Sequence, residues 1–330
     1  MPRASVRRAP VPVLLSLLLW IPGAAGAASL AAGEGQADSM ERLVIIEQAI
    51  SGMDRSQLPG LRNWAARDPN ERVRERSIGA LTLLEDREAG AILQRLLAGD
   101  PSGRVRRSAA EASGILGLSS LRGTLAERLA GDRDPYVRAE CARALGRLPA
   151  TDGNPLLVSL VTDPDPEVRA LSAEAIVLLK PRDFLGPLRA AALQDPSALV
   201  RIYAIRGLAE VDPAGSASLF DQAWRNSDDP DLRMEAFRGL LRSGTGEDTV
   251  QAGLADADDR VRFLAFRSWL AKRFPPVRSR DNPPAAADSI RLLSGFLSDR
   301  LRGIRELARE EMERQGFRVR PSGFGYSIER

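Results

Sequence analysis

Apolar and polar positions along this chain follow a pattern that recurs about every 32 residues. The most regular part of the pattern is one apolar residue, the anchor, followed directly by an arginine. The eight pairs are Val73-Arg74, Val105-Arg106, Val137-Arg138, Val168-Arg169, Val200-Arg201, Leu232-Arg233, Val261-Arg262 and Ile304-Arg305. Their arginines are separated by 32, 32, 31, 32, 32, 29 and 43 residues. Such self-similarity predicts a stacked array of units, none of which buries its apolar face alone.

Each unit carries the signals of a helix start just before its anchor. An oxygen-bearing side chain stands five residues before the anchor, and a proline follows it in most units. Such an oxygen accepts hydrogen bonds from the free N–H groups of a first helical turn, where proline loses nothing. We therefore expect helix N-caps at Asp68, Asp100, Asp132, Asp163, Asp195, Ser227, Asp256 and Asp299.

Small side chains follow each anchor by four residues, which is one helical turn. They are Ser77, Ala109, Cys141, Ser172, Ala204, Ala236, Ala265 and Ala308. Small residues on that face allow a neighbouring helix to approach closely. A second helix per unit is predicted by the apolar spacing in segments such as AGAILQRLLAGD, which begins at Ala89. Each unit is therefore expected to be a helix pair.

The arginine after each anchor has two interpretations. In the structural one, it pairs with the aspartate of a neighbouring turn, where an exposed ion pair contributes about 0.2–1 kcal/mol. In the functional one, the arginines form a basic stripe for an anionic ligand. The similar numbers of basic and acidic residues, 47 and 44, favour the structural interpretation.

The pattern Asp-Pro-x-x-x-Val-Arg-x-x-Ala-x-x-Ala-Leu resembles HEAT-type repeats, in particular the short HEAT-like repeats first associated with phycobilisome lyases. The resemblance covers roughly Asp54 to Gly316. It implies an all-α fold, a right-handed α-solenoid of about eight HEAT-like helix pairs. The family consists mostly of interaction scaffolds with a few enzymes, so the resemblance implies the fold more sharply than the function.

The N-terminus reads as a secretory signal peptide. Arg3, Arg7 and Arg8 precede a short apolar run, and Ala25-Gly26-Ala27 follows it. The run is short for a membrane span and contains Pro12, so cleavage after Ala27 is expected; an uncleaved anchor is the rival. We expect a signal peptide (1–27), a leader (28–37), a capping helix (38–53) with Asp38 and Glu41 as capping box, an array (54–316) and a tail (317–330). We therefore expect the protein to be exported and to be either periplasmic or secreted.

Charge and composition exclude several classes of chemistry. Loss of residues 1–27, which hold three arginines and no acid, removes the formal charge of +3, so no nucleic-acid partner is expected. The chain has no histidine and one cysteine, which leaves no histidine-ligated metal and no serine or cysteine triad. Cys141 is expected to be a buried structural residue rather than a reactive thiol. We predict no metal site, no cofactor and no catalytic residue.

The wide last interval comes from a proline-rich insertion at 274–289, which is expected to be a surface loop. Arg278 and Arg280 in it are candidates for partner contact, although such an insertion can also be inert. The tail alternates Phe317 and Val319, then Phe324, Tyr326 and Ile328, which predicts an extended segment covering the last repeat. The alternative for the tail is a peptide that docks on another protein.

Repeats five to seven differ in the residues two and six positions beyond the anchor. Ile202, Met234 and Phe263 stand at the first position, and Arg206, Arg238 and Arg267 at the second. Aromatic residues, methionine and arginine are enriched in interface cores. We therefore predict a partner-binding surface at Ile202, Tyr203, Arg206, Met234, Arg238, Phe263 and Arg267. The rival explanation is a larger core, into which Phe237 and Phe266 are expected to be buried.

The predicted function is a non-catalytic exported HEAT-repeat scaffold that mediates protein-protein interaction. The alternative is a phycobilisome-lyase-like HEAT enzyme or a chaperone acting on a protein substrate. The resemblance to deoxyhypusine hydroxylase does not carry over, because that enzyme holds iron through His-Glu motifs and this protein has no histidine. A purely structural envelope component is a third possibility.

Overall fold

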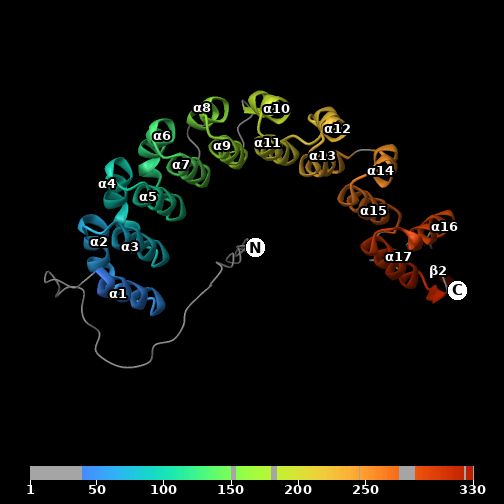
Figure 1. Ribbon diagram of the computed structural model, residues 1–330, viewed down its shortest axis with the longest axis horizontal. Coiled ribbons are helices and arrows are strands. Elements are labelled where there is room, and N and C mark those ends of the chain that lie inside the picture. Colours follow the sequence, from blue (N-terminus) through green and yellow to red (C-terminus); the bar gives the residue numbers. More distant parts are fainter. Residues whose placement is uncertain are drawn as a thin grey trace, which may run out of the picture.

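The computed structural model describes residues 39–149, 154–179, 184–244, 246–274, 287–322 and 325–329. Within them, eight consecutive helix pairs form an arc with an outer and an inner row (Figure 1). The outer row is α2 (Leu58–Arg67), α4 (Gly90–Gly99), α6 (Arg122–Gly131), α8 (Asn154–Thr162), α10 (Leu185–Gln194), α12 (Ala217–Asn226), α14 (Glu247–Leu254) and α16 (Ala287–Gly295). The inner row is α3 (Glu71–Leu83), α5 (Gly103–Ile115), α7 (Pro135–Arg147), α9 (Pro166–Leu179), α11 (Ala198–Val211), α13 (Pro230–Arg242), α15 (Asp259–Arg273) and α17 (Arg302–Arg314). The predicted α-solenoid of about eight helix pairs is confirmed.

Short 3-10 turns lead into or follow several outer helices. They are η2 (Arg55–Gln57), η3 (Arg87–Ala89), η4 (Ser119–Leu121) and η6 (Phe296–Ser298). At the N-terminal end of the arc, α1 (Ser39–Ser51) packs against α3 and buries Ile46 completely. Among the described elements, it stands in the inner row without an outer partner (Figure 1) and covers the first pair.

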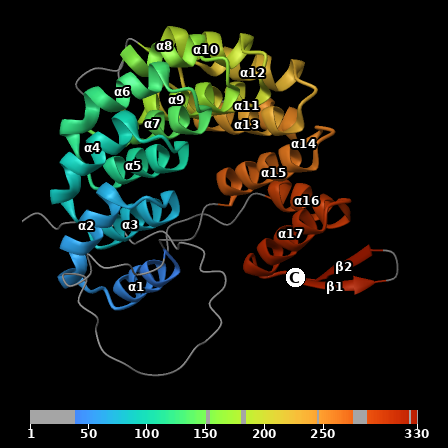
Figure 2. The same cartoon turned by 60° about the vertical axis from the view of Figure 1, so that its left-hand side comes forward.

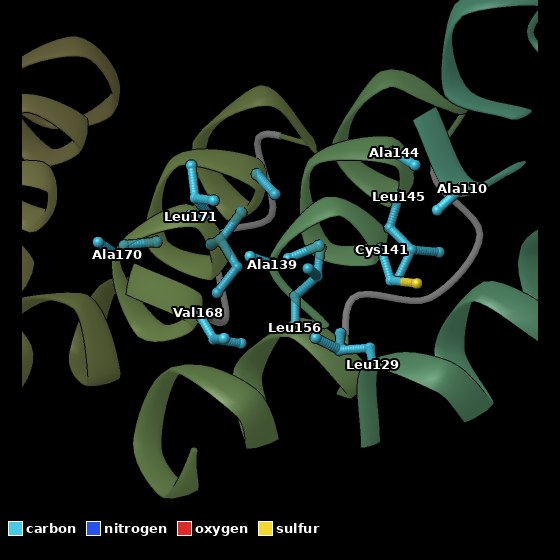
Figure 3. Close-up of a cluster of buried hydrophobic side chains, with 14 of the residues drawn as sticks. Ala110, Leu129, Ala139, Cys141, Ala144, Leu145, Leu156, Val168, Ala170 and Leu171 are labelled. Atoms are coloured by element: carbon cyan, nitrogen blue, oxygen red, sulfur yellow. The ribbon is translucent and has the colours of Figure 1, made fainter. Parts of the chain in front are cut away.

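The core runs between the two rows and is built from the repeated positions. Every apolar anchor is at most 3% exposed, and every small residue four positions later is fully buried. Figure 3 shows Cys141 in this layer, beside Leu145 and Ala144, with Leu129 below them. Burial, the largest cause, raises the pKa of the Cys141 thiol, so the cysteine is an inert packing residue as expected.

The helix starts lie two residues later than predicted. Asp68, Asp100, Asp132, Asp195 and Ser227 are C-caps of the outer helices. The N-caps of the inner helices are Asn70, Ser102, Asp134, Ser197, Asp229 and Asp258. The repeated aspartate accepts the N–H of the N-cap residue instead, at 2.9 Å between Asp100 Oδ1 and Ser102 N. The prediction was wrong by two residues because a link of three residues separates the two helices, and its last residue, not its first, caps the inner helix.

Six of the repeated aspartates form close ion pairs, five with anchor arginines and one with Arg42 of α1. Ion pairs join Arg42–Asp68, Arg74–Asp100, Arg106–Asp132, Arg138–Asp163, Arg169–Asp195 and Arg233–Asp256. The structural interpretation is thereby confirmed for five of the eight anchor arginines, Arg74, Arg106, Arg138, Arg169 and Arg233. The pairs are more buried than expected, since Arg106 is 5% and Asp132 4% exposed. We call this row of pairs the arginine ladder.

The C-terminal tail forms a two-stranded antiparallel hairpin rather than a single extended segment. Strand β1 (Arg318–Ser322) pairs with β2 (Gly325–Glu329) in the register Val319↔Ile328. The hairpin lies beside α17 (Figure 2), and Val319 is buried in the C-terminal core with Phe317 and Tyr326 packed nearby.

The predicted signal peptide (1–27), the leader (28–37) and Asp38 lie outside the described residues. Most of the proline-rich insertion does too, including Arg278 and Arg280. The insertion ends earlier than expected, because α16 begins at Ala287. Within the described part of the chain, no helix combines the length and apolarity that crossing a membrane requires.

Candidate protein-binding surface

The predicted surface residues lie on three successive helices of the inner row, α11, α13 and α15. Ile202, Met234 and Phe263 are half-buried, whereas Arg206, Arg238 and Arg267 are exposed. The outer row covers the opposite side of these helices (Figure 1), so the exposed side chains border the inner surface of the arc. The residues two positions beyond the anchors therefore contact both the core and the solvent.

Four of these residues converge on one open pocket of about 450 Å³. Met234 and Arg238 enter it from α13, and Phe263 and Arg267 from α15. The other lining residues are Asp259, Arg260, Leu264, Leu301 and Gly303. We call it the Phe263 pocket. Its lining combines the apolar side chains of Met234, Phe263, Leu264 and Leu301 with three arginines and one aspartate.

Gly303, at the start of α17, gives the Phe263 ring its room. A Cβ atom on Gly303 would stand 3.1 Å from Cε2 of Phe263, closer than ordinary side-chain packing. Ile202, Tyr203 and Arg206 do not line the pocket and lie one repeat away on α11. The predicted surface thus divides into the pocket and a flanking part.

The three arginines differ in what they bind. Arg206 and Arg238 both donate to the buried carboxylate of Glu235, with Arg206 Nη2 at 2.8 Å and Arg238 Nη1 at 3.0 Å from Oε1. The hydrogen bond to Glu235 raises the pKa of Arg206, which also lies over the Tyr203 ring at 5.7 Å. Among the described residues, Arg267 has no ion pair, so it is the arginine free to meet an acidic partner group.

Most of the nearby aromatic residues belong to the core. Phe237 and Phe266 are fully buried, as expected from their positions. Trp224 packs against Phe237 with ring centroids 4.9 Å apart and donates from Nε1 to Asp256 at 2.7 Å. The rival explanation of a larger core is therefore correct for these rings, and Phe263 is the aromatic residue that reaches the pocket.

A second buried glutamate, Glu140, escaped the sequence analysis. It occupies the position in α7 that Glu235 occupies in α13, three residues beyond the anchor, and is 3% exposed. Arg143 pairs with one carboxylate oxygen, and the other has no hydrogen-bond partner. Burial, the largest cause, raises the pKa of Glu140. The positive charge of Arg143 opposes this rise, and the negative charge of Glu111 adds to it. The ionised carboxylate therefore costs stability.

Replacing Glu140 with glutamine is expected to stabilise the protein at neutral pH by about 1 kcal/mol, because a buried charge is removed while the shape is kept. A raised pKa means that the folded state takes up the proton more readily. The wild-type protein should gain stability as the pH falls through the folded pKa, above the ordinary value of 4.5. The difference between variant and wild type should therefore shrink in acid, as thermal unfolding across pH would show. A variant less stable than wild type at neutral pH would mean that the Arg143 pair outweighs burial.

The architecture defines an α-solenoid of stacked helix pairs with an inner surface open to solvent. The sequence profile of HEAT repeats matches residues 58–130, 122–192 and 185–269. These ranges span more than half of the chain, which belongs to the HEAT-repeat family. The likeness to the phycobilisome-lyase type of repeat suggested by the sequence falls within this family.

Solved structures with a similar fold come from several sources. The YibA protein of Escherichia coli is 24% identical, with a TM-score of 0.51 over 70% of this chain and 87% of that one. The complex of CpcE and CpcF of phycocyanin lyase from Nostoc sp. PCC7120 is 17% identical, with a TM-score of 0.43 over 77% and 98%. The likeness to the YibA protein shows the fold alone. No curated protein sequence matches the chain.

Proposed function

We propose that this protein is an exported, non-catalytic HEAT-repeat scaffold that binds another protein through the Phe263 pocket. The observation that carries the proposal is an open apolar pocket beside an arginine without an ion pair among the described residues. An apolar side chain of the partner fills the pocket, and an adjacent acidic side chain pairs with Arg267. Such a combination of apolar anchor and arginine is typical of the residues that dominate binding energy.

The flanking residues support the pocket rather than bind directly. Glu235 holds Arg206 and Arg238 in place, so these two arginines present a fixed and partly neutralised edge. Ile202 and Tyr203 pack against the core and extend the same inner surface. A HEAT array is a rigid curved platform of this kind, because each helix pair is fixed by its neighbours. The proposed scaffold needs no cofactor.

The proposal is tested by capturing the partner of the tagged full-length protein from the envelope fraction of its own cells after crosslinking. The matched variants are Arg267→Glu, which reverses the free charge at the pocket, and Arg72→Glu, which reverses an exposed arginine on α3 far along the array. We expect one stoichiometric partner with wild type and Arg72→Glu, and at least tenfold less with Arg267→Glu, about 1.4 kcal/mol.

A partner retained equally by wild type and both variants would contradict the assignment of the pocket. The intact mass of the tagged protein itself, isolated from the same fraction, tests its processing. A mass that begins at Ala28 would support export with cleavage, and a mass that includes residues 1–27 would contradict it. Similar far-ultraviolet circular dichroism of the two variants serves as the control for folding.

A further inference from the structure

The arginine ladder has the same geometry in four successive repeats, those of Arg74, Arg106, Arg138 and Arg169. In each of these rungs, Nε and Nη2 of the arginine donate to the two oxygens of one aspartate, with Arg106 Nε 2.8 Å from Asp132 Oδ2 and Nη2 2.7 Å from Oδ1. The remaining nitrogen, Nη1, donates to the backbone oxygen of Asp100 at 2.8 Å. The bond to the backbone carbonyl thus fixes the orientation of the guanidinium group independently of the carboxylate. Two parallel N–H···O bonds of this kind form one of the strongest pairings available to a carboxylate.

In the next repeat, the fork of Arg201 lacks a carboxylate. Ser227 occupies the position whose aspartate would pair with Arg201. Its hydroxyl oxygen accepts the N–H of Asp229 at 3.1 Å, as the aspartates of other repeats accept the N–H of the N-cap residue. Ser227 offers no carboxylate to Arg201. Arg201 is nevertheless held in the ladder pose, with Nη1 donating to the backbone oxygens of Asp195 at 2.7 Å and Pro196 at 3.2 Å. Among the described residues, its Nε and Nη2 have no partner.

An open pocket of about 470 Å³ is lined by Arg201 and the link 227–229. Pockets also border the pairs of Arg106 with Asp132 and Arg138 with Asp163, but there an aspartate occupies the fork of the arginine. Ala192, Leu193 and Ala223 add an apolar wall to the Arg201 pocket from α10 and α12. This pocket lies at the edge of the array where these outer helices end, away from the Phe263 pocket. A ligand at Arg201 would therefore not compete with one at Phe263.

Two aspartates also line the pocket, and neither completes the rung. Asp229 is the N-cap of α13, and its carboxylate accepts the N–H groups of Asp231 and Leu232. Asp228 is exposed and forms no ion pair with Arg201. The fork of Arg201 therefore remains available to a carboxylate from outside the protein.

We propose that the Arg201 pocket binds a carboxylate group of another polypeptide, which takes the place of the absent aspartate. The guanidinium Nε and Nη2 donate to its two oxygens, and the wall of Ala192, Leu193 and Ala223 contacts the adjoining aliphatic carbons. An aspartate or glutamate side chain supplies the same chemistry as the C-terminus of a polypeptide. The site is independent of the proposed function of the Phe263 pocket.

The test measures peptide binding to the full-length protein by saturation-transfer difference NMR, which detects weak ligands. The probes are Ac-Gly-Asp-Gly-NH2, with the carboxylate of an aspartate, Ac-Gly-Gly-Ala-OH, with a C-terminal carboxylate, and the neutral Ac-Gly-Asn-Gly-NH2. The variants are Arg201→Gln, which removes the fork, and Ser227→Asp, which restores the rung within the protein. Ser102→Asp is the matched control, because it adds an acid at the N-cap of α5 beside an intact rung.

At least one carboxylate peptide is expected to bind wild type and Ser102→Asp at least tenfold more tightly than the neutral peptide does. Binding should weaken at least tenfold in Arg201→Gln and Ser227→Asp, and the preferred carboxylate peptide identifies the source. Equal binding of all three peptides would overturn the proposal. So would undiminished binding to Ser227→Asp, or to an Arg201→Gln variant that circular dichroism shows to be folded.

Discussion

Replacing Arg106 with glutamine is expected to lower the free energy of unfolding by about 3–5 kcal/mol, the cost of leaving one member of a buried ion pair alone. Arg106 and Asp132 are 5% and 4% exposed, so water cannot solvate the carboxylate that remains. The variant also loses the bond to the backbone oxygen of Asp100. Urea unfolding followed by far-ultraviolet circular dichroism measures the change.

The matched control is Arg201→Gln, which removes an arginine of the same pose from a rung without a carboxylate. No buried acid is left behind, so the expected loss is about 1 kcal/mol or less, that of the backbone hydrogen bonds. Equal losses in the two variants would contradict the view that the ladder stabilises through its ion pairs.

The pH dependence of the Arg106 variant separates charge from packing. Burial alone would raise the pKa of Asp132, but hydrogen bonds from Arg106 and the Asp134 N–H lower it below 3.8. In wild type, the carboxylate therefore stabilises the fold above that pH, and the contribution is lost as the pH falls through the lower folded pKa. Without Arg106, protonation removes an uncompensated charge, so the deficit of the variant should narrow in acid. A deficit independent of pH would indicate lost packing.

Replacing Gly146 with alanine is expected to destabilise the protein by about 1–3 kcal/mol, the usual cost of overpacking a core. The new Cβ would stand 2.8 Å from the Cα of Ala175 on α9, and a backbone atom cannot move aside without shifting the helix. Gly146 therefore sets how closely α7 and α9 approach. Thermal unfolding of the variant measures the effect.

Gly79 is the control for this substitution, because it lies within α3 and an added Cβ would meet nothing within 4 Å. Alanine at position 79 is expected to stabilise the helix by about 0.5–1 kcal/mol, through its lower conformational entropy in the unfolded state. A stabilising effect at both positions would mean that the contact between α7 and α9 yields readily to an extra methyl group.

Part of the candidate site could be predicted because its residues keep a constant distance from the anchors. Met234 and Phe263 are two positions beyond theirs, and helical periodicity alone places that position outside the core stripe. Glu235 and Glu140 were missed, since a charged residue in an amphipathic helix is expected to be exposed, and neighbouring helices bury these two. The Phe263 pocket also needs Leu301 and Gly303, which follow the proline-rich insertion.

The sequence by itself determined the repeat length, the paired helices, the buried anchors and the small residues beside them. These features are local, because each depends on spacings within about one unit and recurs often enough to stand out from the rest of the sequence. Only the tertiary structure decided that the repeated aspartates close an arginine ladder instead of capping helices, and that Arg201 meets no carboxylate in its rung. Such facts depend on which side chains meet across neighbouring repeats, and stacking, rather than local periodicity, sets those distances.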